Sequence, residues 1–304
     1  MISLKNNLIS IQVLEDCGFT ISKILYKDID ILYFPFNNEI YKKNKELAGI
    51  PLLYPFANRL YYNSFLLEGK KVNLNFPNIF RDEKQFPIHG LLLKSNHWKI
   101  IQRKKDYVKA QFLFSENWLN YFPFEHTLEY SIELKENQIE LKIEIKDLKE
   151  PLPISFGFHP YFLINQPKEN TAIFLPAKKW LLKNDQMFPI KEEPIIDFFK
   201  KNNILFEELQ EGYKINLDKN YSWDDSFLDF YIVDGGTKFE IFQKKYIVSL
   251  YFDSQFSVSQ IYSPKDQNFI CIEPMTCKTN AFCENQYFCI SNPTTFLFII
   301  KIIG

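Results

Sequence analysis

Two titratable residues follow apolar segments and are each followed directly by proline. His159 ends a run of apolar and small residues that begins at Leu152, and Glu273 ends a shorter run that begins at Phe269. Proline favours an extended backbone before it and cannot donate to a strand ladder, so we expect a strand to end at each position. An imidazole and a carboxylate held rigidly in this way can act as a general acid and a general base if the fold brings them together. For a single histidine, a packed structural side chain with one ring nitrogen bound to a backbone carbonyl is the commoner explanation.

Two further residues have side chains suited to binding hydroxyl groups. Arg59 is one of only three arginines and ends the proline-broken apolar segment that begins at Gly49. A guanidinium presents a fixed fork of donors that matches neighbouring hydroxyls or a carboxylate better than lysine does, although a surface turn would explain it equally. His89 stands beside Gly90, which permits close approach of backbone or ligand.

A pair of acids follows a tryptophan at Trp223-Asp224-Asp225. Carboxylates beside an aromatic ring suit a sugar, because the ring packs on the apolar face of the sugar and the carboxylates accept from its hydroxyls. A solvated turn is the commoner explanation of such a pair.

Short alternating segments occur along most of the chain. Apolar residues recur with period two between frequent turn residues, which is typical of strands. Lys135-Glu136-Asn137 separates two long runs and predicts a hairpin turn. The predicted strands are 8–13, 19–25, 30–33, 65–74, 98–102, 107–114, 125–134, 138–145, 152–158, 171–175, 238–242, 247–252, 257–262, 269–272 and 295–303.

This pattern predicts an all-β protein, a large sandwich of antiparallel sheets that forms a single domain over residues 1–304. The one helical candidate is short and lies within 197–209. A β-propeller is the structural rival, but it would show a repeat of blade length, and the sequence has no repeat of fixed period.

The composition excludes several classes of partner. Net charge is -1 and lysine greatly outnumbers arginine, so no basic surface for nucleic acid is expected. The N-terminal residues lack the order of a signal peptide, and the most apolar run, 296–303, contains Lys301 and is too short to span a bilayer. We therefore expect a cytoplasmic protein with a small, neutral partner, no membrane contact, and a monomeric or homodimeric state.

Five cysteines occur, at 17, 271, 277, 283 and 289. The odd number argues against a disulfide framework, and the even spacing of the last four lacks any C-x-x-C pair. Ordinary thiols in a reducing compartment are expected rather than a zinc site.

The motifs together resemble one known family. Gly49-Ile50-Pro51-Leu52-Leu53-Tyr54-Pro55 with Asn58-Arg59, His89-Gly90, Gly157 to Phe162, Asp224-Asp225 with Phe227, and Glu273 to Thr276 occur in the order and at the separations of the aldose 1-epimerase (galactose mutarotase) family. The resemblance spans nearly the whole chain. It implies a large antiparallel β-sandwich with a sugar in an open cleft, and no cofactor or metal.

Carried over to this sequence, the resemblance implies that His159 is the general acid and Glu273 the general base of sugar ring opening. It also implies that Arg59, His89 and Asp224 hold sugar hydroxyls, with Asp224 preferred to Asp225 because it stands three residues before the phenylalanine. The sequence departs from the family pattern after His89-Gly90, where Leu-Leu-Leu-Lys follows in place of an aromatic residue and an arginine.

Three questions stay open at this stage. A hexose 6-phosphate would need further cations, for which Lys94 is the available candidate. A carbohydrate-binding protein without turnover would keep the cleft, although the presence of both His159 and Glu273 argues against it. The identity of the sugar would depend on the segments 61–86 and 178–222, whose placement the sequence does not reveal.

Overall fold

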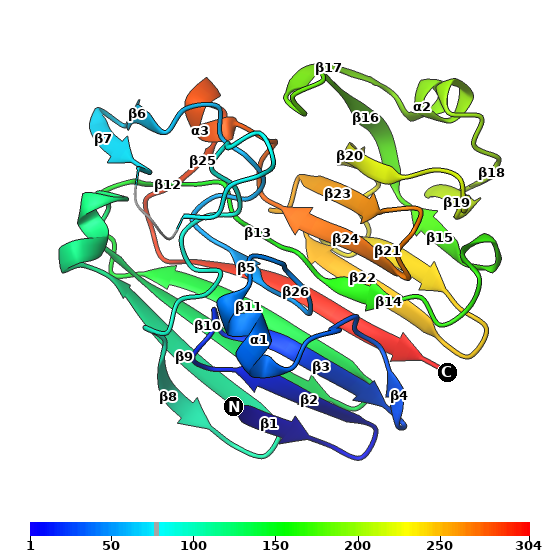
Figure 1. The fold of residues 1–304 in the computed structure, drawn as a ribbon, viewed down its shortest axis with the longest axis horizontal. Coiled ribbons are helices and arrows are strands. Elements are labelled where there is room, and N and C mark those ends of the chain that lie inside the picture. The colour runs from blue at the N-terminus through cyan, green and yellow to red at the C-terminus, as the bar shows by residue number, and fades with distance from the viewer. Residues whose placement is uncertain (76–78) are drawn as a thin grey trace.

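The computed structural model describes residues 1–75 and 79–304, and two large antiparallel sheets dominate it (Figure 1). The larger sheet has ten strands. In spatial order they are β18 (Phe206–Leu209), β19 (Gly212–Asn216), β15 (Ala172–Leu175), β21 (Gly236–Phe242), β22 (Ile247–Asp253), β26 (Thr294–Ile303), β11 (Gln138–Lys146), β10 (His126–Lys135), β9 (Tyr107–Phe114) and β8 (Lys99–Arg103).

The second large sheet has eight strands and carries the site. In spatial order they are β17 (Pro189–Pro194), β16 (Ala177–Lys183), β20 (Trp223–Phe230), β23 (Val258–Ser263), β24 (Phe269–Met275), β13 (Gly157–Phe158) and β5 (Leu52–Leu53), with β14 (Tyr161–Leu163) also pairing with β24.

Smaller elements surround these sheets. They are a sheet of β1 (Ile2–Lys5), β2 (Ile9–Leu14), β3 (Thr20–Tyr26) and β4 (Ile29–Asp30), the pairs β12 (Leu152–Ile154) with β25 (Phe288–Ile290) and β6 (Ser64–Leu67) with β7 (Lys70–Asn73), the helices α1 (Asn38–Lys43), α2 (Ile195–Lys201) and α3 (Ala281–Glu284), and 3₁₀ turns at Glu116–Asn120 and Lys168–Asn170.

Aromatic side chains join the two large sheets. The Phe158 ring of β13 lies 5.5 Å from that of Phe298 in β26, and the Phe230 ring of β20 lies 5.5 Å from that of Phe239 in β21. Strand β11 is buried on alternate residues only, whereas every residue of β24 is buried. Because successive side chains of a strand point to opposite faces, β24 must be covered on both. The expected all-β antiparallel sandwich is confirmed.

Most of the predicted strands are present, but the predicted strand 30–33 is wrong because β4 ends at Asp30, and four further details differ. The segment 65–74 is a hairpin, because Glu68 and Gly69 both have positive φ. The predicted 152–158 strand is interrupted between β12 and β13, which belong to different sheets. Helix α2 begins at Ile195 and ends at Lys201, and the residues after it form strand β18.

The fourth difference concerns the acids. Asp224 lies in strand β20 rather than in a turn, and Glu273 lies inside β24, which continues through Pro274 to Met275. Pro274 therefore does not end its strand, whereas β13 ends just before His159, as expected.

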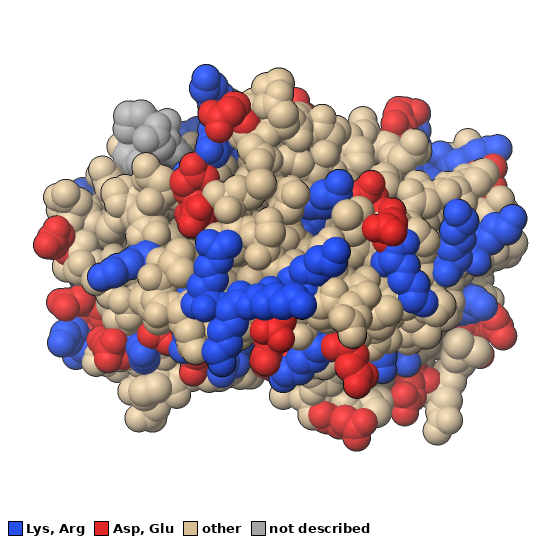
Figure 2. All heavy atoms as spheres, turned by 90° about the horizontal axis from the view of Figure 1, so that it is seen from below, with Lys and Arg blue, Asp and Glu red and all other residues tan. Residues whose placement is uncertain are grey.

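Charged side chains of both signs lie among uncharged residues on the face shown in Figure 2. A band of lysine and arginine crosses the middle of this face, and acidic side chains lie beside it. Within the described part of the chain, no helix is long and apolar enough to cross a membrane.

Candidate active site

His159 is held between two strands that both pair with β24. Its backbone N–H donates to the carbonyl of Pro51 at 3.1 Å, next to strand β5. The preceding side chain, Phe158, points into the core between the sheets, so alternation directs His159 to the opposite face. His159 is only 5% exposed, and its imidazole stacks on the ring of Tyr161 at 4.4 Å.

Glu273 reaches the same face from β24. Its neighbour Ile272 faces the core between the sheets, which turns the carboxylate outward, and Glu273 is only 2% exposed. The carboxylate oxygen Oε1 lies 3.4 Å from His159 Nε2. The structure thus brings together the imidazole and the carboxylate that each precede a proline.

Burial governs how this pair titrates. It lowers the pKa of His159 to about 3 and raises the pKa of Glu273 well above its usual value of 4.5, with the negative charge of Asp224 adding to the second shift. Both shifts favour neutral groups, because a charge in this dry environment loses its hydration. The pair therefore holds one proton over a wide pH range, and the two groups titrate as a unit.

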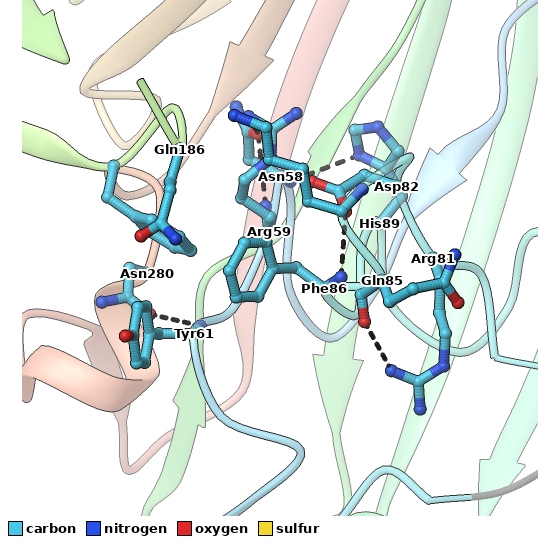
Figure 3. A network of polar contacts seen from close by, with 12 residues as sticks. Asn58, Arg59, Tyr61, Arg81, Asp82, Gln85, Phe86, His89, Gln186 and Asn280 are labelled. Carbon is cyan, nitrogen blue, oxygen red and sulfur yellow. Dashed lines mark hydrogen bonds and ion pairs between the residues drawn. The ribbon is translucent and has the colours of Figure 1, made fainter. Parts of the chain in front are cut away.

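His89 and Asn58 form the adjoining wall of the site. Both have left-handed backbones, with φ of 63° and 57°. The Asn58 backbone N–H donates to His89 Nδ1 at 3.3 Å (Figure 3). His89 Nδ1 is therefore an unprotonated acceptor, and burial lowers the pKa of His89 well below its usual value. A neutral His89 presents Nε2–H as its hydrogen-bond donor.

Gly90 explains why the chain can approach so closely here. A Cβ atom at this position would lie 2.2 Å from the carbonyl oxygen of Tyr54, and φ is +77°. The expectation of a close backbone approach beside His89 is confirmed.

Arg59 is fixed by an acid that the sequence analysis did not identify. Its Nε donates to Asp82 Oδ2 at 2.9 Å, and its Nη1 donates to Asn58 Oδ1 at 3.2 Å (Figure 3). The other oxygen of Asp82 accepts from the backbone N–H groups of Lys84 and Phe86. One carboxylate thus organises the 82–86 turn and orients the guanidinium.

The sheet alternation distinguishes the two neighbouring acids. Asp224 lines the cleft, and its Oδ1 accepts from Gln260 Nε2 at 2.5 Å. Asp225 is excluded from this cleft, and its Oδ2 accepts from the Tyr221 hydroxyl at 2.9 Å. Gln260 is itself held by the Ser226 hydroxyl and stands opposite Glu273 in the strand register.

All five predicted site residues line one open cleft of about 440 Å³. The described lining consists of Asn58, Arg59, Arg81, Asp82, Glu83, Lys84, Ile88, His89, His159, Tyr161, Met187, Asp224, Gln260, Tyr262 and Glu273. The sequence analysis quoted Asn58 within a motif without giving it a role, and it missed Asp82 and Gln260. Gln260 could have been found only from the pairing register of its strand, which a single sequence does not provide.

Lys94 does not belong to this cleft, contrary to its suggested role with a phosphate. Its ammonium group donates to the backbone carbonyls of Tyr41 and Glu46 and lines a different cavity. The segment 178–222, which the sequence could not place, contributes β16, β17 and α2 near the outer end of the site-bearing sheet. Residues 76–78 of the 61–86 segment lie outside the described residues.

All five cysteines are free thiols. In residues 1–75 and 79–304, no group of three or more His, Cys, Asp or Glu side chains is arranged to hold a metal ion.

Comparison with known proteins relates this fold to a family of solved structures. A galactose mutarotase-like protein from Clostridium acetobutylicum superposes with a TM-score of 0.81 at 19% identity, covering 99% of this chain and 93% of that chain. The Slr1438 protein from Synechocystis sp. PCC 6803 gives 0.77 at 18% identity, covering 99% and 95%. Galactose 1-epimerase from Lactobacillus acidophilus NCFM gives 0.70 at 14% identity, covering 99% and 93%.

These identities show a shared fold, and no curated protein sequence matches the chain. The sequence model of the family described as aldose 1-epimerase matches residues 1–293, which is nearly the whole chain. The chain belongs to the aldose 1-epimerase family.

Proposed function

We propose that this protein is an aldose 1-epimerase that interconverts the α and β anomers of a free aldose. The observation that carries the proposal is the 3.4 Å separation of His159 Nε2 and Glu273 Oε1 at the wall of an open cleft. A single sugar ring can contact both groups, and Arg59, His89 and Asp224 are available for its remaining hydroxyls.

The chemistry requires two proton transfers at one carbon. Opening a cyclic hemiacetal removes the proton of the C1 hydroxyl and adds a proton to the ring oxygen, and either step alone builds an unfavourable charge. With the shared proton on His159, Glu273 accepts the hydroxyl proton while His159 protonates the ring oxygen. The C1–O5 bond breaks, the C1 carbonyl forms, and the proton now rests on Glu273.

Reclosure reverses these steps on the other face of the aldehyde. Rotation about C1–C2 presents that face, Glu273 returns its proton to the carbonyl oxygen, and His159 recovers its proton as the C5 hydroxyl attacks. The pair ends as it began, so no proton is consumed. Each positioned acid or base contributes typically about 10²–10⁴-fold to the rate.

The charges in the cleft support a neutral substrate over a hexose 6-phosphate. The lining contains four carboxylates, of Asp82, Glu83, Asp224 and Glu273, against three cations. Each of these cations already has a protein acceptor: Arg59 binds Asp82, Arg81 binds Asn63 and backbone carbonyls, and Lys84 binds the Asp185 carbonyl. A phosphate dianion would meet the carboxylates without an uncommitted cation.

The same proposal includes a cytoplasmic location and a monomeric or homodimeric state. The five free thiols are consistent with a reducing compartment.

Polarimetry of freshly dissolved sugars tests the proposal. We expect the protein to accelerate the change in optical rotation of α-glucose, α-galactose or another free aldose. The corresponding 6-phosphates should be accelerated less. If only the 6-phosphates were accelerated, the substrate would be a hexose 6-phosphate and not a free aldose. Calorimetric sugar binding without any acceleration would identify a binding protein instead.

A further inference from the structure

Lys183 is a buried cation beside the sugar cleft that neither the family motifs nor the sequence analysis assigns. It ends strand β16, the neighbour of the strand that carries Asp224. Its side chain is only 8% exposed. A lysine is rarely buried to this extent unless its ammonium group is paired, because removing the charge from water is costly.

The partner of the ammonium group is Asp224. Lys183 Nζ donates to the backbone carbonyl oxygen of Asp224 at 2.6 Å and lies 3.7 Å from its carboxylate oxygen Oδ1. Oδ1 is also the atom that accepts from Gln260. Gln260 therefore donates a hydrogen bond to this carboxylate oxygen and Lys183 forms an ion pair with it, while the Asp224 side chain is 43% exposed.

The charges that face Lys183 come from several elements. Asp224 and Asp225 lie on β20, Glu273 lies on β24 and Arg59 lies on the segment after β5. Three of these groups are carboxylates, and Arg59 is already paired with Asp82. Lys183 and Arg59 are thus two cations that offset the carboxylates at this end of the site, and of the two only Lys183 also contacts Asp224. Burial lowers the pKa of Lys183, whereas the acids around it act in the opposite direction.

We propose that Lys183 is a positioning residue of the sugar site, which fixes the Asp224 carboxylate for a sugar hydroxyl and, together with Arg59, adds positive charge on the Glu273 side of the cleft. The catalytic part of this inference rests on the proposed function. Because an opposite charge favours the ionised form of a carboxyl group, loss of Lys183 raises the pKa of Glu273.

The test compares Lys183→Met with Lys183→Arg. Methionine keeps the length and apolar stem without the charge, and a buried cation replaced by an apolar side chain of similar volume commonly leaves folding intact. Lys178→Met is the matched control, since Lys178 lies on the same strand, is exposed and pairs with Asp229 outside the cleft. Thermal unfolding of each variant monitors folding.

Two measurements are made on each protein. Calorimetry with methyl β-glucoside, which cannot open its ring, measures binding without turnover. For Lys183→Met we expect the affinity for the glycoside to fall about tenfold. This corresponds to the loss of one charge-assisted hydrogen bond between a sugar hydroxyl and the Asp224 carboxylate. The pH profile of anomer interconversion should also move its alkaline limb to higher pH by roughly one unit. Lys183→Arg should keep most of the parental affinity and a nearly parental alkaline limb. Lys178→Met should match the parent in both measurements.

Three results would overturn the inference. The first is a Lys183→Met protein with parental affinity and an unmoved alkaline limb. The second is an equal loss of affinity in Lys183→Met and Lys178→Met. The third is a loss of affinity in Lys183→Arg as large as that in Lys183→Met. If Lys183→Met does not fold, the comparison of Lys183→Arg with Lys178→Met decides, and an arginine variant with no affinity for the glycoside counts against it. A parent protein that binds the glycoside but turns over no sugar rejects the proposed function, while the affinities still decide the positioning of Asp224.

Discussion

At the scale of single residues, the site depends on two ionisable groups kept in an environment that disfavours charge. His159 and Glu273 are nearly inaccessible to solvent, and burial moves their pKa values in opposite directions. From the sequence alone, ordinary values would place the two titrations near about 4.3 and 6.5 with a narrow optimum between them. The fold changes that expectation, because burial can be read only from the structure.

The first prediction is a broad pH profile. The active form carries one proton on the pair, so kcat/KM is lost when a second proton binds and again when the remaining proton leaves. The pKa of His159, lowered to about 3, sets the acid limb, and the raised pKa of Glu273 places the alkaline limb above 4.5. We expect kcat/KM, measured by polarimetry, to show no acid limb between pH 4.5 and the pH at which the protein unfolds. An acid limb at or above pH 4.5 would contradict this account.

The residues that the sequence predicted and those it missed differ in kind. His159 and Glu273 stood out because each follows an apolar run and precedes proline, and Arg59 because arginine is scarce. Lys183 is one lysine among many, and nothing in its neighbours along the chain signals that it lies beside Asp224. Contacts made through strand pairing leave no local trace in a single sequence.

At the scale of elements, the distance between the catalytic candidates depends on how closely β13 approaches β24. Gly157 pairs with Met275 in this ladder. A Cβ atom at Gly157 would lie 2.5 Å from the carbonyl oxygen of Pro274 and 2.7 Å from Met275 Cγ. The absent side chain therefore allows His159 and Glu273 to meet.

The second prediction is that Gly157→Ala separates these strands. We expect a destabilisation of about 1–3 kcal/mol from overpacking, and a fall in kcat of up to about 10²-fold if the pair moves by about 1 Å. Urea unfolding and polarimetry measure the two effects. Gly69→Ala is the control, because Gly69 lies in the β6–β7 hairpin with positive φ and open space around it. It should lose stability without losing kcat, and equal kcat losses in both variants would refute the argument.

Alternation of apolar residues predicted most of the strands, including β9, β10, β11 and β26. It did not predict strand β20, because Asp224, Asp225 and Ser226 interrupt the apolar pattern that marks a strand. It also could not predict that β16 lies next to β20, because strand order depends on contacts between distant segments.

At the scale of the whole molecule, the sandwich buries histidines that are neutral in the folded state. His126 Nδ1 donates to the Phe124 carbonyl at 2.8 Å, which leaves Nε2 to accept from the Tyr54 hydroxyl at 2.7 Å. Burial lowers the pKa of His126 from 6.5 to about 4. This histidine joins β10 to the segment that carries Arg59.

The third prediction concerns stability against pH. A histidine with a lowered pKa in the folded state takes up a proton more readily in the unfolded chain. Its contribution is therefore fully present above pH 6.5 and is lost as the pH falls to about 4, by about 3 kcal/mol. His126→Gln removes this titration while the other buried groups remain in both proteins. Urea unfolding measures the free energy of unfolding of the parent and of the variant at each pH. The difference between the two proteins should change by about 3 kcal/mol between pH 7 and pH 4. Parallel curves would show that His126 does not titrate in this way.

The central claim is that Glu273 accepts the proton of the C1 hydroxyl. Glu273→Gln keeps the shape and hydrogen-bonding capacity of the side chain but cannot accept a proton, so it separates chemistry from binding. Glu133→Gln, at a partly exposed acid on β10, serves as the control.

The decisive measurement is the rate of anomer interconversion by Glu273→Gln, followed by polarimetry on the aldose that the parent protein turns over best. We predict a kcat at least about 10²-fold below that of the parent, with the affinity for the corresponding methyl glycoside nearly unchanged by calorimetry and with Glu133→Gln at the parental rate. A Glu273→Gln protein that turns over the sugar at the parental rate would contradict the account.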